Sequence, residues 1–247
     1  MIFKCATDFD KNQIRDRRDR GFDGTHVRLV EPKRFLSLHG VTSIEVSLDK
    51  CEDTTLLNFN SMSSAVTTPL GVVFDFDEIL KKHVLDMSDV VSTFCTIFNK
   101  SNVNVLIQNT LAIDDGVKWL SDVDYCAFLV SEFKRMGFYN IGLSLDTGAA
   151  VQRGHSIKRV FTKHADIIKD VVIRNHPYDS GYSISNAISL PKLFDIFVGY
   201  TESGCTADIT VDVFETAVNS GRNSEETLKA CKYVLDKIAD KDGVTEC

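Results

Sequence analysis

The sequence predicts an α/β protein, a single (β/α)8 barrel, on three observations. Eight short apolar runs recur along the 247 residues, helical patterns follow the later runs, and no glycine-rich nucleotide motif is present. Strands that alternate with crossover helices form a parallel sheet, and eight such units in about 250 residues are the usual size of a closed barrel. A doubly wound open sheet is the alternative. It loses its main support because neither G-x-G-x-x-G nor G-x-x-x-x-G-K-S/T occurs.

The expected strands are rich in Val, Ile and Leu, as parallel strands covered on both faces are. They are residues 2–6, 26–30, 43–48, 72–76, 103–108, 141–146, 170–174 and 208–213. Apolar residues at helical spacing predict helices over 78–98, 115–136, 156–168, 188–202 and 224–240. Gly137 is a stop signal for the second of these helices. The connections after the first three strands show weaker periodicity.

Composition predicts one domain, residues 1–247, because the chain has only four prolines and no low-complexity linker. The seven cysteines are an odd number and include no Cys-x-x-Cys, which is typical of a reduced cytoplasmic protein. The N-terminus has no apolar signal core, and no apolar run of about 18 residues could cross a bilayer. We therefore expect a soluble protein without a membrane partner.

The net charge of −7 argues against generic nucleic-acid binding, which requires Lys and Arg to neutralise phosphates. The charge is uneven, since residues 1–34 carry nine Lys or Arg against six Asp or Glu. Four arginines in that segment could contact phosphate, but interleaved Asp16 and Asp19 favour a solvated helix face instead. The four are Arg15, Arg17, Arg18 and Arg20.

Polar side chains stand at the ends of the last four expected strands. Gln108, Asp146 and Asp212 end their strands, and His176 follows the strand at 170–174. Active sites of (β/α)8 barrels are built at these C-terminal strand ends. Carboxylate and imidazole suit Mn²⁺, Zn²⁺, Fe²⁺ or Mg²⁺, and an amide oxygen is a weaker, neutral ligand. The pattern predicts a site for a divalent metal or a polar substrate, although each residue alone could have a structural role.

A second group of polar residues lies on the early strands. His26 and Arg28 alternate on the second strand, so both side chains face the same side of the sheet. The pair could contact an anionic substrate. Alternatively it neutralises Glu45 and Asp75 on the neighbouring strands, because buried charges require partners.

Four short motifs, taken in order, resemble those of the xylose-isomerase-like barrel superfamily, which includes sugar epimerases and endonuclease IV-type apurinic endonucleases. That superfamily has a strand ending Glu-Asn, an Asp-Thr-Gly-His turn, a His-Leu-x-Asp segment and a strand ending in Glu. The matching segments are Ile107-Gln108-Asn109, Asp146-Thr147-Gly148-Ala149, His176-Pro177-Tyr178-Asp179 and Thr210-Val211-Asp212. An earlier segment, Val41-Thr42-Ser43-Ile44-Glu45-Val46, resembles an early strand of the superfamily, so the resemblance covers residues 40–215.

The resemblance implies a role for each matched residue. Asp146 and His176 resemble metal ligands, while Gln108 and Asp212 stand where the superfamily has metal-binding, proton-moving glutamates. The implied metal ligands are Asp146, His176, Asp212 and Gln108. The implied catalytic residues are Asp212, Asp179 and Glu45, and the expected substrate contacts are Gln108, Asn109, His26 and Arg28.

Three functions follow as hypotheses, and the expected partner is a small-molecule substrate rather than nucleic acid. The first is a metal-assisted isomerase or epimerase acting on a small sugar or hydroxycarbonyl compound. The second is a barrel without catalysis that binds a ligand or partner. It is motivated by Gln108, whose amide cannot act as a base, and by Ala149, which replaces a histidine. The third is a metal-dependent phosphodiesterase. The sequence identifies neither the substrate nor the oligomeric state.

Overall fold

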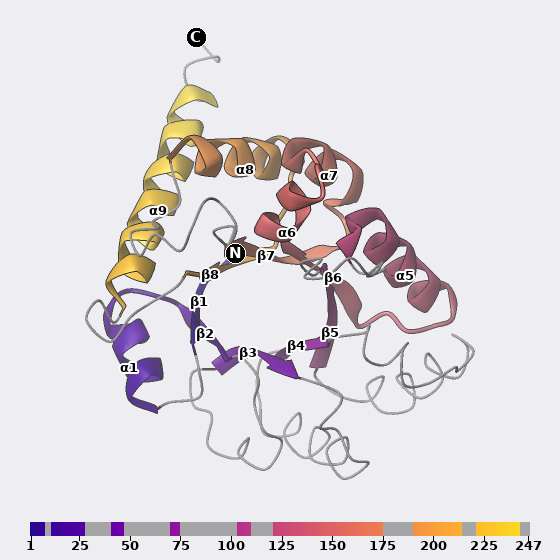
Figure 1. Cartoon of the computed structure of the whole chain (residues 1–247), viewed down its shortest axis with the longest axis horizontal. Coiled ribbons are helices and arrows are strands. Elements are labelled where there is room, and N and C mark those ends of the chain that lie inside the picture. Colours follow the sequence, from indigo (N-terminus) through magenta and orange to yellow (C-terminus); the bar gives the residue numbers. More distant parts are fainter. Residues whose placement is uncertain are drawn as a thin grey trace.

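The fold is a closed ring of eight parallel strands with helices on the outside (Figure 1). The computed structural model describes residues 1–7, 11–27, 41–46, 70–74, 103–109, 121–174, 190–213 and 221–242. The strands follow one another around the ring in sequence order, and the last pairs with the first. The predicted (β/α)8 barrel is confirmed.

Each expected strand forms, and each begins within two residues of its predicted start. The strands are β1 (Phe3–Thr7), β2 (Gly24–Val27), β3 (Val41–Val46), β4 (Leu70–Phe74), β5 (Val103–Gln108), β6 (Ile141–Asp146), β7 (Ile168–Arg174) and β8 (Asp208–Asp212). Because all strands run parallel, their C-terminal ends meet at one rim of the ring, which we call the mouth.

The described helices are α1 (Lys11–Asp19), α5 (Val123–Arg135), α6 (Thr147–Gln152), α7 (Ile157–His164), α8 (Leu190–Glu202) and α9 (Arg222–Asp242). Four of the expected helices are confirmed where the chain is described, and the fifth, 78–98, lies outside the described residues. Gly137, at φ +95°, ends α5 as predicted. Within the described chain, no helix is both long and apolar enough to cross a membrane.

The short helix α6 was not expected. The sequence Asp-Thr-Gly is typical of a turn, but Asp146 instead caps a helix, since its Oδ1 accepts a hydrogen bond from the Ala149 N–H at 2.9 Å. An aspartate at this position satisfies one of the amide groups that a helix start leaves without an acceptor. The carboxylate is therefore fixed to the backbone directly above β6.

The apolar core lies between the ring and the helices. Leu143 and Leu145 of β6 are fully buried, as are Phe161 of α7 and Phe197 of α8. Each such side chain contributes about 1.5–3 kcal/mol relative to an exposed one. Successive strand residues face opposite sides, so the residues between these apolar ones face the inside of the ring.

The inside of the ring is partly polar. Lys4 of β1 reaches Asp170 of β7 at 2.8 Å, although β8 separates the two strands, so the ion pair crosses the interior. Thr210 donates a hydrogen bond to Asp170 Oδ1 at 2.8 Å, and Ser144 donates to Asp170 Oδ2 at 3.2 Å. Barrel interiors are usually filled with Val, Ile and Leu. In this barrel a buried ion pair and hydroxyl groups share the interior with apolar side chains such as Leu106 and Val172.

Two of the four arginines of the basic N-terminal segment, Arg17 and Arg20, make contacts within the protein, and Arg15 and Arg18 are exposed. Arg15, Arg18 and Asp19 are exposed, as expected of a solvated helix face, whereas Arg17 is only 3% exposed and departs from that expectation. Arg20 pairs with Asp16 on its own helix and with Glu225 of α9, both at 2.8 Å. These contacts connect α1 to α9 and give the phosphate-binding interpretation no support.

We predict that Lys4→Met lowers the free energy of unfolding by about 3–5 kcal/mol, because removing one partner of a buried pair leaves the other charge uncompensated. Urea denaturation measures the change. The matched control is Lys229→Met on α9, whose lysine is 71% exposed and pairs with Glu225; its effect should stay below about 1 kcal/mol. Equal losses for the two variants would contradict the interior role of Lys4.

Candidate active site at the barrel mouth

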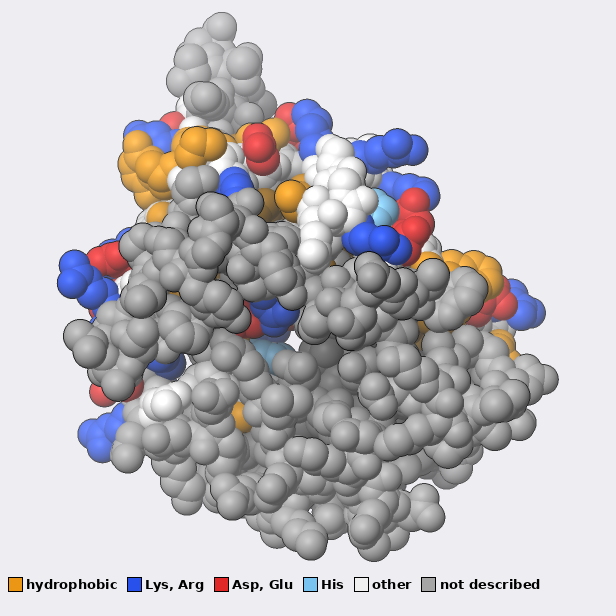
Figure 2. All heavy atoms as spheres, viewed as in Figure 1, with side chains coloured by type: hydrophobic (Ala, Val, Ile, Leu, Met, Phe, Trp, Pro, Cys, Tyr) orange, Lys and Arg blue, Asp and Glu red, His pale blue; other side chains and the backbone are white. Residues whose placement is uncertain are grey.

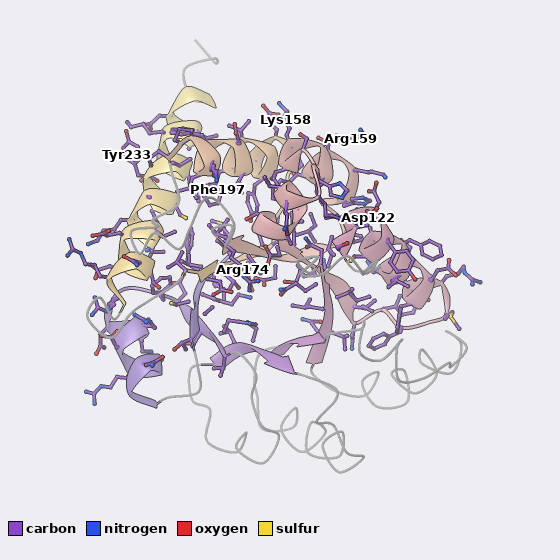
Figure 3. All side chains as sticks on the ribbon, viewed as in Figure 1. Asp122, Lys158, Arg159, Arg174, Phe197 and Tyr233 are labelled. Carbon is purple, nitrogen blue, oxygen red and sulfur yellow. The ribbon has the colours of Figure 1, made fainter. Side chains whose placement is uncertain are left out.

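Two carboxylates meet one arginine at the mouth. Asp146, Arg174 and Asp212 are the last residues of β6, β7 and β8, three consecutive strands. Arg174 Nη1 lies 2.7 Å from Asp146 Oδ2, Arg174 Nε donates to Asp212 Oδ2 at 2.9 Å, and Nη2 contacts the same oxygen. Figure 3 shows Arg174 projecting toward the middle of the ring. We call these three residues the arginine-carboxylate cluster.

Arg174 was not among the predicted site residues, although the sequence held the signal. It is the last residue of the expected strand 170–174 and so occupies the same strand-end position as Asp146 and Asp212. The sequence reasoning instead favoured His176, two residues later, because imidazole is a common metal ligand. Applying the strand-end rule to every polar side chain would have found it.

Asp146 is completely buried. Burial raises the pKa of its carboxyl above the ordinary value, the positive charge of Arg174 and the Ala149 N–H oppose that shift, and the negative charge of Asp212 adds to it. Its Oδ2 forms an ion pair with Arg174. Among the described residues, no donor reaches this oxygen in hydrogen-bond geometry. Asp146 is therefore a carboxyl that requires a nearby cation to stay ionised.

Asn109 holds the backbone of Asp146 in place. Its Oδ1 accepts from the Asp146 N–H at 2.7 Å, and its Nδ2 donates to the Asp146 carbonyl at 2.9 Å. The side chain is fully buried. Asn109 was expected to contact substrate, which stays a prediction; in the structure both polar ends of its amide bind the backbone of Asp146.

Gln108 belongs to the polar interior below the cluster. Its side chain is 8% exposed. In the register of β5 and β6, Gln108 pairs with Ser144, which lies two residues before Asp146 and faces the same side of the sheet. Its Oε1 lies 3.3 Å from the Ser144 hydroxyl, whose single proton is shared between Gln108 and Asp170 Oδ2. The amide thus joins the polar interior around the buried Lys4–Asp170 pair without adding charge.

The remaining predicted site residues are placed only in part. His26 is 5% exposed, and its Nδ1 lies 2.9 Å from the Ser43 hydroxyl on β3. Glu45 belongs to β3, where the structure describes its backbone alone. Arg28, His176 and Asp179 lie outside the described residues, so their roles stay predictions.

The described part of the site does not fit a divalent metal in its present arrangement. Asp146 and Asp212, both predicted ligands, contact the Arg174 guanidinium with their Oδ2 atoms. A metal ion at its usual distance of about 2 Å from those oxygens would overlap the guanidinium and repel its charge. Among the described residues, no three His, Cys, Asp or Glu side chains are grouped to hold a metal.

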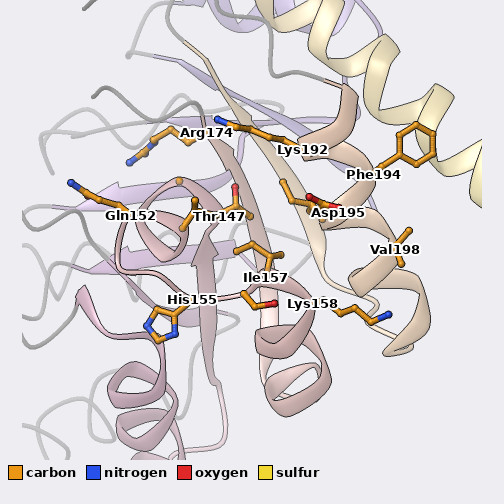
Figure 4. A pocket seen from close by; sticks show the side chains of 14 residues that line it. Thr147, Gln152, His155, Ile157, Lys158, Arg174, Lys192, Phe194, Asp195 and Val198 are labelled. Carbon is orange, nitrogen blue, oxygen red and sulfur yellow. The ribbon is translucent and has the colours of Figure 1, made fainter. Parts of the chain in front are cut away.

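A cavity of about 890 Å³ opens beside the cluster, between α6, α7 and α8 (Figure 4). Arg174 and Gly148 line one end, and His155, Lys192 and Asp195 are among its polar walls. A side chain at Gly148 would place its Cβ 3.1 Å from the Arg174 carbonyl oxygen and 3.3 Å from Asp146 Oδ1. Glycine therefore allows the close approach of α6 to the cluster. In Figure 2, charged side chains of both signs are visible in the hollow at the centre of the face.

Solved structures with this fold include two epimerases. A 3-keto-D-glucoside 4-epimerase from E. coli superposes with a TM-score of 0.66 at 13% identity, covering 94% of this chain and 99% of that one. A D-allulose 3-epimerase from Methylomonas sp. gives 0.68 at 12% identity, covering 95% and 98%. Endonuclease IV from Thermus thermophilus gives 0.62 at 10% identity, covering 96% and 100%.

No protein-family model and no curated protein matches the sequence. At identities this low the likeness establishes the fold alone. The chain has the fold of the xylose-isomerase-like TIM barrel proteins, and the resemblance expected from the four motifs is confirmed at that level.

We predict that Gln108→Glu lowers the free energy of unfolding by about 1–3 kcal/mol at pH 7, because it buries a carboxylate beside Ser144 and Asp170 without a new cation. Urea denaturation measures this loss. The control is Gln152→Glu on the exposed surface of α6, which should change stability by no more than about 0.5 kcal/mol. A Gln108→Glu variant as stable as wild type would show that the interior tolerates another negative charge.

Proposed function

We propose that this protein binds a small sugar or hydroxycarbonyl compound at the barrel mouth, with the Arg174 guanidinium as its cationic contact. One observation carries the proposal: a guanidinium is fixed between Asp146 and Asp212 at the C-terminal strand ends, beside a cavity of about 890 Å³. Ligand sites typically have volumes of about 300–1,000 Å³ and a few convergent polar groups. The cavity and the cluster together meet both conditions.

The chemistry of the cluster suits a ligand rich in oxygen atoms. A guanidinium is a planar, permanently charged donor that binds carbonyl, hydroxyl and carboxylate oxygens. Its two carboxylate partners fix its orientation, so little side-chain freedom is lost when a ligand binds. Apolar walls such as Ile157, Phe194 and Val198 can cover the carbon skeleton of the same molecule.

An isomerase or epimerase activity is the second candidate, and the placement of Asp212 favours it. Its side chain is 7% exposed, in contrast to fully buried Asp146, and it lies against the guanidinium. In such a reaction Asp212 would take the proton from the carbon next to the carbonyl and return it. Arg174 would stabilise the negative charge that develops on the carbonyl oxygen in between.

Binding is tested with a panel of ketoses and small hydroxyketones, by calorimetry on the full chain. We expect at least one ligand to bind wild type, and Arg174→Met to weaken that ligand by about tenfold or more, since a charge-assisted hydrogen bond contributes about 1.5–3 kcal/mol. Arg135→Met is the matched control, because Arg135 is 70% exposed and pairs only locally with Glu132 among the described residues. Equal binding by wild type and Arg174→Met would contradict the proposal.

The same ligands distinguish binding from catalysis when they are incubated with the protein in D₂O. Proton NMR detects loss of the hydrogen next to the carbonyl if the protein exchanges it. Exchange that Asp212→Asn abolishes supports the isomerase or epimerase candidate. If a ligand binds but no hydrogen is exchanged, the protein only binds that ligand, and isomerase or epimerase activity is excluded for the ligands tested.

A further inference from the structure

We infer that the Arg174 guanidinium occupies the position of a divalent cation, and that removing it turns Asp146 and Asp212 into a metal site. The inference starts from the disagreement between the predicted metal ligands and the observed cluster. Both carboxylates point one oxygen, Oδ2, at the same guanidinium, and they do so from strands on either side of β7. The protein therefore already has a cation where a metal would lie.

Charge makes a cation necessary at this position. Asp146 is completely buried and Asp212 is 7% exposed. With both ionised, the cluster carries one net negative charge even when Arg174 is included. Two carboxylates this close, taken out of water, repel each other and each loses its hydration. Without Arg174 the pair must take up a proton or bind another cation.

Asp146 is held by contacts that do not depend on the guanidinium. Asn109 fixes the backbone of Asp146, and the Ala149 N–H holds Asp146 Oδ1, which leaves Oδ2 directed at the cluster. Such outer contacts are what orient metal ligands in proteins.

The expected cation is a hard one with oxygen ligands. A site of two carboxylate oxygens and water molecules favours Mn²⁺ and Mg²⁺, which bind oxygen ligands in preference to thiolates or imidazoles. Mn²⁺ is the more useful probe, because its electron paramagnetic resonance signal distinguishes bound from free ion. Guanidinium chloride at low millimolar concentration is the second probe, since it restores the missing group itself.

The experiment compares full-length wild type with Arg174→Ala, by thermal unfolding and by Mn²⁺ titration. We expect no Mn²⁺-dependent rise in the Tm of wild type. For Arg174→Ala we expect a rise of several degrees that EDTA reverses, because a ligand specific to the folded state stabilises it. Millimolar guanidinium should also raise the Tm of this variant and should weaken its apparent Mn²⁺ affinity by competing for one position.

Two further variants make the result specific. Arg174→Ala/Asp146→Asn removes one ligand and should weaken Mn²⁺ binding by about tenfold or more. Arg135→Ala removes an exposed arginine and should behave as wild type with every additive. If Arg174→Ala does not fold, Arg174→Met is measured in its place, and restoration of folding by Mn²⁺ or guanidinium supports the inference.

Several outcomes would overturn the inference. One is a wild-type Tm that rises with Mn²⁺ as much as that of Arg174→Ala. Another is a folded Arg174→Ala that binds neither Mn²⁺ nor guanidinium. A third is a pair of unfolded variants that neither cation restores. Each would show that Arg174 does not stand in for a cation at the carboxylate pair.

Discussion

An ionised side chain that points into a closed ring of eight parallel strands is buried there, so it requires a partner inside the ring. This constraint organises the molecule in two levels. At the lower level Lys4 neutralises Asp170, and Ser144 and Thr210 complete the hydrogen bonds of that carboxylate. The mouth above carries the arginine-carboxylate cluster, in which one guanidinium serves both carboxylates. Gln108 belongs to the lower level, where its neutral amide contacts Ser144.

The cluster shows one way in which two carboxylates at the mouth of this fold can be held together by a cation. A metal ion and a guanidinium are both cations that hold two carboxylates together, but only the guanidinium is covalently part of the chain. A site with Arg174 offsets one of the two carboxylate charges without taking up an ion. It also presents hydrogen-bond donors with fixed directions, which favours recognition of oxygen-bearing ligands over the polarisation that a dication supplies.

Much of the barrel could be predicted, because Val, Ile and Leu runs and the repeated strand–helix alternation depend on local sequence. The strand-end rule likewise placed Asp146 and Asp212 at one rim. Contacts across the ring could not be predicted, since the Lys4–Asp170 pair joins residues far apart in the chain. The role of Asn109 was missed for a related reason: its partners are backbone atoms, which carry no sequence signal.

The most direct measurement of the central claim is a crystal structure of the wild-type protein grown with Mn²⁺, with anomalous diffraction collected at the manganese absorption edge. The account predicts no anomalous peak between Asp146 and Asp212, and an Arg174 guanidinium that contacts both carboxylates. A peak within bonding distance of the two Oδ2 atoms, with Arg174 turned away, would contradict it.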